Sequence, residues 1–219
     1  MKTSVRTFFG VTDLPPPDIA KDALTAQVVT TATDYWTSHM HLHMDNMTDP
    51  DDREYGNTDF QVVAQLFNVV RYLNVKQNRF FMYKPELRYL ASQGRPPQVD
   101  VCIRDDTRAI LLVVKVDRHL RGSDPELQLI SDAIAAFHND SIMRVKRLGT
   151  NPLTSKVMPG IVMDGTMPTF YKIPITPKLV TAVESGGQPE EETIVCAYRT
   201  EPRGRYEAVG QLFHYPLML

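Results

Sequence analysis

The fold is decided by residues 97–138, which read PQVDVCIRDDTRAILLVVKVDRHLRGSDPELQLISDAIAAFH. The first part predicts two β-strands, 98–103 and 109–116, because β-branched residues dominate both and a polar turn separates them. The second strand is apolar without alternation, which is typical of a central strand covered on both faces. An Asp-Pro pair at 124–125 predicts the start of a helix, and apolar residues at helical spacing extend it to about His138.

The flanking segments predict a mixed sheet. A helix precedes the stretch, and the segments after it alternate between strand-like and helical patterns; the expected elements are a helix over 58–75, strands over 79–90, 159–166, 168–175 and 193–198, and a short helix over 177–185. Three successive strands suggest an antiparallel meander, and the strand–helix–strand crossover that follows adds a parallel pair. We therefore expect an α/β (α+β) fold in which helices flank a mixed central β-sheet.

The chain divides into two regions by composition. Residues 57–219 carry the periodic apolar pattern and predict the α/β core. Residues 1–56 predict a helical or irregular N-terminal extension that ends in an acidic loop rich in turn-forming residues. A basic run at 144–147 has two interpretations, a contact for phosphate groups or a solvated strand edge.

Composition restricts the classes of function. The net charge of −2 gives no global basic field for nucleic acid or membranes, so any basic patch is local. Cys102 and Cys196 both lie in apolar runs and predict two free core thiols in a reducing compartment. The longest aliphatic run, Ile110–Val114, is too short to span a bilayer, and the first residues lack the apolar region of a signal peptide. We expect a soluble intracellular protein, cytoplasmic or nuclear, with no membrane partner.

Three short blocks carry a resemblance to a known family: PQVD at 97–100, LVVK at 112–115, and PELQ at 125–128. In this order of strand, strand and helix, they resemble the PD-(D/E)XK nuclease superfamily, which has a restriction-endonuclease-like fold. The resemblance covers roughly residues 58–175. The longer blocks PELQLISDAIAAF and GTMPTFYKIPIT also look like those of a group of fungal proteins with this nuclease-like core.

The resemblance implies a metal-dependent active site. In that family, an Asp on the second strand and an acid two residues before a Lys on the third strand bind one or two Mg²⁺ ions. Residues i and i+2 of a strand share a face, which explains the spacing. By this resemblance the catalytic candidates are Asp100, Lys115, Asp117 and Gln128, the metal-ligand candidates are Asp100, Asp117 and Glu86, and the cofactor is Mg or Mn.

The sequence departs from the family pattern at one position. Val113 stands two residues before Lys115, where the family has a carboxylate, and valine cannot bind a metal. A reversed register, with Asp117 two residues after Lys115, keeps both on one face. Two functions therefore stay open. One is a metal-dependent nuclease that cleaves DNA or RNA phosphodiesters. The other is a catalytically inactive nuclease-like domain that binds a protein or a nucleic acid.

A second metal hypothesis rests on three alternating histidines. His39, His41 and His43 would share one face of a strand, and neutral imidazole is a common zinc ligand. The other interpretation is a half-buried polar edge. The chain has neither a Gly-x-Ser-x-Gly motif nor a phosphate-cradling glycine loop. The sequence therefore gives no evidence for a nucleophile-elbow hydrolase or a P-loop protein.

Overall fold

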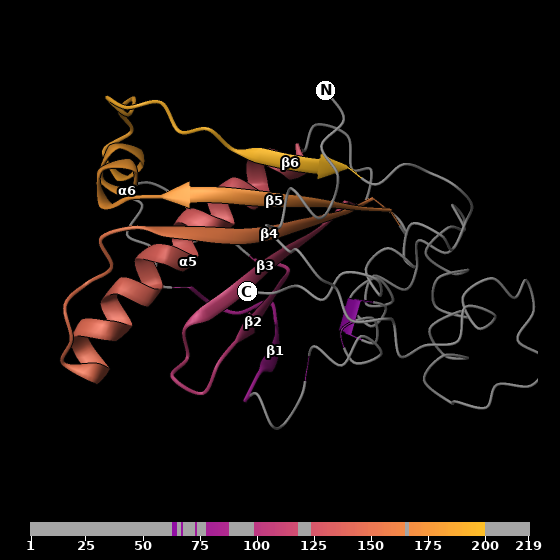
Figure 1. Cartoon of the computed structure of the whole chain (residues 1–219), viewed down its shortest axis with the longest axis horizontal. Helices are drawn as coiled ribbons and strands as arrows, with labels where there is room; N and C mark the ends of the chain where they lie inside the picture. The colour runs from indigo at the N-terminus through magenta and orange to yellow at the C-terminus, as the bar shows by residue number, and fades with distance from the viewer. Residues whose placement is uncertain are drawn as a thin grey trace, which may run out of the picture.

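The computed structural model describes residues 63–64, 67, 73, 78–87, 99–117, 124–164 and 167–199. Their strands form a single sheet, flanked by helices (Figure 1). In chain order the elements are β1 (Phe80–Tyr83), β2 (Val101–Arg104), β3 (Ile110–Asp117), α5 (Pro125–Leu148), β4 (Lys156–Asp164), β5 (Met167–Ile175), α6 (Pro177–Glu184) and β6 (Cys196–Arg199). This arrangement is an α+β fold.

The sheet is mixed, as the sequence predicts. The six strands lie in chain order from β1 to β6. Strands β1, β2 and β3 form an antiparallel meander, β3 pairs with β4 in parallel, and β5 and β6 continue with antiparallel pairing. The only parallel pair in this sheet is therefore the one joined by the α5 crossover, because a parallel pair needs a long connection.

Strand β3 lies at the centre of the sheet and is buried on both faces. Val113, which points to one face, and Leu112 and Val114, which point to the other, are at most 1% exposed. This confirms the expectation for an apolar run without alternation.

Helix α5 begins where the sequence predicts and ends later. The side chain of Asp124 caps it by accepting hydrogen bonds from the backbone N–H of Glu126 and Leu127, at 3.0 and 3.2 Å. The predicted end near His138 is wrong, because the helix continues to Leu148. The interpretation of the basic run at 144–147 as a strand edge is therefore wrong. The run forms the last turns of α5, where cations are favourable.

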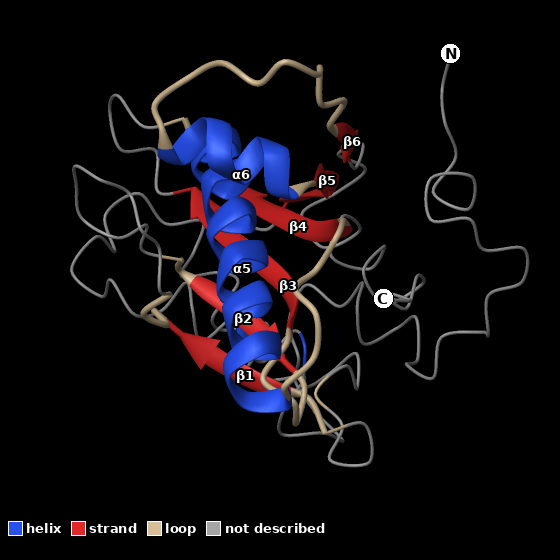
Figure 2. Ribbon diagram, turned by 90° about the vertical axis from the view of Figure 1, so that its left-hand side faces the viewer, coloured by secondary structure: helices blue, strands red, loops and turns tan. Residues whose placement is uncertain are grey.

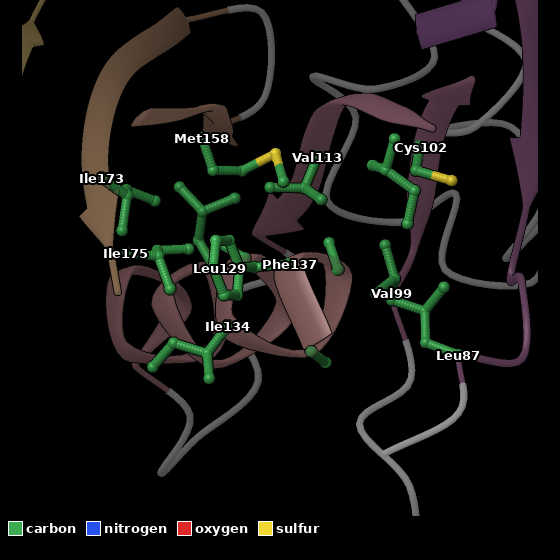
Figure 3. Packing of buried hydrophobic residues seen from close by; sticks show 14 of the residues in the cluster. Leu87, Val99, Cys102, Val113, Leu129, Ile134, Phe137, Met158, Ile173 and Ile175 are labelled. Atoms are coloured by element: carbon green, nitrogen blue, oxygen red, sulfur yellow. The ribbon is translucent and has the colours of Figure 1, made fainter. Parts of the chain in front are cut away.

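Helix α5 covers one face of the sheet, with α6 beside it (Figure 2). Leu129 and Phe137 of the helix join Val113 and Met158 of the strands in one apolar cluster (Figure 3). Gly160 on β4 permits this close approach, because an added Cβ would lie 2.8 Å from Leu129 Cδ2. Burial of the apolar cluster is the main force that holds the helix on the sheet.

Several expectations concern single residues or fall outside the described part. Both cysteines are free, but only Cys102 is buried; Cys196 is exposed on the edge strand β6, so the prediction of a core thiol is wrong there. Burial raises the pKa of the Cys102 thiol to about 11. Of the helix expected over 58–75, the described residues Val63, Ala64 and Phe67 are helical, but Leu73 lies in a bend, so the predicted end at 75 is wrong. The extension 1–56 lies outside the described residues. No described helix is long and apolar enough to cross a bilayer.

Candidate functional site

Strands β2 and β3 bring Asp100 and Lys115 together. Asp100 directly precedes β2, and the antiparallel register of Val101 with Val114 places it opposite Lys115. The Lys115 Nζ lies 3.1 Å from Asp100 Oδ2, and both side chains are 14% exposed. The acid and the amine of the sequence motif therefore share one face of the sheet, as expected.

Backbone groups of the neighbouring strands hold Asp100 in place. The backbone N–H of Val116 donates to Asp100 Oδ2 at 3.3 Å. The backbone N–H of Lys84, just after β1, donates to the Asp100 carbonyl oxygen at 2.9 Å. Asp100 is thus fixed by the strands on both sides of β2.

Helix α5 supplies a second carboxylate, from Asp132, which the sequence analysis did not identify. Asp132 lies on the sheet-facing side of the helix with Leu129 and Ala133, which are fully buried. Its side chain is 3% exposed, and its Oδ2 has no hydrogen-bond partner in the described part of the chain. A buried carboxylate oxygen without a partner is costly, and such groups are common at functional sites.

The charges of Asp132, Lys115 and Asp100 act on one another. Burial raises the pKa of Asp132 to about 7, the positive charge of Lys115 opposes this rise, and the negative charge of Asp100 adds to it. The Asp132 carboxyl group therefore lies within electrostatic reach of the Lys115–Asp100 ion pair. A carboxyl group with a pKa near neutrality is typical of a catalytic or metal-binding position.

Val113 is a core residue and not part of the charged group. It occupies the position where the family motif places an acid, and it is fully buried in the apolar cluster under α5. Lys115 lies two residues further along the same face of β3. The position of the expected acid thus belongs to the core, and the acid that the charge of Lys115 influences lies on helix α5.

In the described part of the chain, no side-chain hydrogen bond or ion pair joins the other predicted site residues to Asp100, Lys115 or Asp132. Gln128 is half-buried one turn before Asp132 on α5. Asp117 ends β3 in register with Asp164, and its side chain lies outside the described part. Glu86 is exposed shortly after β1. The histidine hypothesis, with His39, His41 and His43, also falls outside the described residues.

The donor set suits a hard divalent cation. In the described part of the chain, no three His, Cys, Asp or Glu side chains form a group that could hold a metal. The candidate donors are the two carboxylates of Asp100 and Asp132, and Mg²⁺ is commonly bound by one or two carboxylates together with waters and substrate phosphates. The buried Oδ2 of Asp132, which has no hydrogen-bond partner among the described residues, is an oxygen of the kind that such a cation binds.

A second buried aspartate on α5 has a complete set of partners. Both carboxylate oxygens of Asp140 accept from the backbone N–H of Ile110, at 3.0 and 3.1 Å, and Lys156 Nζ lies 3.0 Å from Oδ2. Lys156 Nζ also donates to the Ile110 carbonyl oxygen. Burial raises the pKa of Asp140, and the charge of Lys156 opposes this. Asp140 thus fastens α5 to the beginnings of β3 and β4.

Comparison with known proteins adds no relative. A scan against protein-family models and a search of curated proteins each found no match. The likeness to PD-(D/E)XK nucleases therefore stays a prediction from the sequence blocks described above.

Proposed function

We propose that this protein is a metal-dependent phosphodiesterase of the PD-(D/E)XK type, which cleaves DNA or RNA. Asp100 and Asp132 would hold one Mg²⁺ or Mn²⁺ ion, and Lys115 would contact the scissile phosphate. The restriction-endonuclease-like fold belongs to the same proposal; a mixed sheet with a helix over the β2–β3 site is compatible with it.

The observation that carries the proposal is the buried Oδ2 of Asp132, which has no hydrogen-bond partner among the residues that the structure describes. A structural aspartate would be expected to satisfy its oxygens, because an unpaired buried acceptor costs about 1–3 kcal/mol. Asp132 instead lies where its charge acts on Asp100 and Lys115. Two acids and one amine within electrostatic reach of one another are groups suited to phosphodiester hydrolysis with a divalent cation.

Each residue has a chemical role in this proposal. A bound cation would lower the pKa of a coordinated water and offset the negative charge that develops on the phosphate. Lys115 would donate hydrogen bonds to a non-bridging phosphate oxygen, since its ammonium group has three donors. Asp132 and Asp100 would orient the water. Hydrolysis adds the water oxygen to phosphorus and breaks the bond to one ester oxygen, which leaves with a proton.

The test is cleavage of single- and double-stranded DNA and RNA, in Mg²⁺ and in Mn²⁺. We expect wild-type protein to cleave at least one of these substrates. Asp132→Asn and Asp100→Asn should each lower kcat/KM on the order of 100-fold or more, because the cation provides several kcal/mol of transition-state stabilisation.

Glu191→Gln is the matched control, because it also removes one carboxylate. Glu191 is exposed between α6 and β6, where it pairs with Lys178 at 2.6 Å, and its loss should leave cleavage unchanged. Cleavage that Asp132→Asn does not affect would overturn the proposal. Binding of Mn²⁺ without cleavage of any of the four substrates would favour the inactive nuclease-like binding module instead.

A further inference from the structure

The Lys115 ammonium group already neutralises this site in the structure. Its Nζ lies 3.1 Å from Asp100 Oδ2, and its charge also acts on Asp132. Both Asp100 and Lys115 are mostly buried, and Asp132 is almost completely so. Two carboxylates in such surroundings need a cation nearby, because unpaired buried charge is expensive.

The contacts of Asp100 Oδ2 leave little room for a further cation. That oxygen accepts a hydrogen bond from the Val116 N–H and lies within ion-pair distance of Lys115 Nζ. A divalent cation at this oxygen would therefore lie close to the Lys115 ammonium group, and the two positive charges repel each other. Because the Val116 N–H is fixed in strand β3, a metal ion that binds Asp100 Oδ2 is expected to displace Lys115.

Lysine is well suited to leave this position. It carries a compact charge on a flexible stem of four carbons, and its donors can turn toward a new acceptor. When a phosphate is present, its oxygens offer that acceptor. The same residue can thus neutralise the carboxylates in the absence of metal and contact the substrate in its presence.

We propose that Lys115 is the resident counter-cation of the site and competes with the divalent cation for Asp100. This inference rests on the proposed function, because it assumes that Asp100 and Asp132 are the metal ligands. The inference predicts that removal of the Lys115 charge tightens metal binding. Removal of either carboxylate should weaken it.

The test is calorimetric titration of Mn²⁺ into metal-stripped full-length protein. Lys115→Met keeps a long unbranched side chain without charge, and we expect it to bind Mn²⁺ on the order of tenfold more tightly than wild type. Lys115→Arg keeps the positive charge and should stay within about threefold of wild type. Unchanged or weaker binding by Lys115→Met would overturn the inference.

Thermal unfolding gives a second readout of the same competition. Without metal, Lys115→Met should melt at a lower temperature than wild type, because Asp100 and Asp132 then lack their counter-cation. Saturating Mn²⁺ should raise its Tm more than that of wild type, since tighter binding stabilises the folded state more. An equal or smaller increase would contradict the competition.

Two further variants separate failure of this inference from failure of the proposed function. Asp100→Asn and Asp132→Asn should each weaken Mn²⁺ binding at least tenfold. If neither does, the metal site itself is wrong. If both do, while Lys115→Met does not tighten binding, only the role of Lys115 is wrong.

Discussion

Asp132 and Asp140 lie on the same sheet-facing side of α5, about two helical turns apart, and both are almost fully buried. Asp140 receives hydrogen bonds from the Ile110 backbone and an ion pair from Lys156. Asp132 keeps one oxygen without a partner in the described part of the chain, and it lies near a second acid, Asp100. The same residue type on one helix face thus has very different surroundings.

This difference separates a structural acid from a functional candidate. Burial raises the pKa of both carboxyl groups, so burial alone does not distinguish them. The partners do, because a fully bonded acid such as Asp140 has little capacity left for a ligand. Burial of Asp132 costs free energy that its hydrogen bonds in the described part of the chain do not fully offset. Such a cost is typical of positions where a bound ligand completes the contacts.

The largest expected effect concerns Asp140, the aspartate that holds α5 on the sheet. Asp140→Ala leaves Lys156 and the Ile110 N–H without their buried acceptor, so we expect a loss of about 3–5 kcal/mol in the free energy of unfolding. Urea unfolding measures this loss. Mn²⁺ affinity of the folded fraction should stay unchanged. A loss below about 1 kcal/mol would mean that Asp140 has no structural role that sets it apart from Asp132.

The second effect concerns Asp132 and depends on pH. Burial raises its pKa in the folded state to about 7 from an ordinary value of 3.8, so between these pH values the native state holds a proton that the unfolded state has lost. The free energy of unfolding of wild type therefore falls as pH rises through this range. Asp132→Asn lacks this titration, and it should be about as stable as wild type at pH 4.

At pH 8, metal-free Asp132→Asn should be more stable than wild type by up to about 4 kcal/mol, at about 1.36 kcal/mol for each unit of pKa shift. Urea unfolding at both pH values, in the presence of a chelator, measures the difference. A difference that does not change with pH would show that Asp132 titrates normally, and the contrast with Asp140 would then disappear.

The smallest effects compare the two ends of α5. Asp124→Ala removes the N-terminal cap, and Gly149→Ala strains the C-terminal residue at φ 62°; each should cost about 1 kcal/mol. Only Asp124→Ala should also weaken Mn²⁺ binding, since it loosens the end of the helix that carries Asp132. Calorimetry on both variants checks this, and equal Mn²⁺ affinities would contradict it.

The sequence predicted those parts of the fold that local patterns control. The meander, the parallel crossover and the pairing of Asp100 with Lys115 follow from strand periodicity and connection length. The end of α5 was predicted too early. Asn139 and Asp140 interrupt the apolar pattern and favour turns. Both are buried, and Asp140 bonds to β3, which stabilises the helix through this point.

The sequence motif does not point to Asp132, because the motif places the acid on β3, next to Lys115. A signal was available in the helix itself. Leu129, Ala133 and Ala136 mark the buried face of α5, and Asp132 falls within that face at helical spacing. A charged residue on an apolar face requires a partner, but sequence spacing does not show which strand lies below it.

The three charged groups come from neighbouring elements of the chain. Asp100, Lys115 and Asp132 all belong to the continuous block β2–β3–α5, and no strand beyond α5 contributes a charged group to the trio. A recombination event that exchanged β5, α6 and β6 would leave the trio on one contiguous piece of gene. All three charged groups thus lie within the stretch of chain from Asp100, just before β2, to the first half of α5.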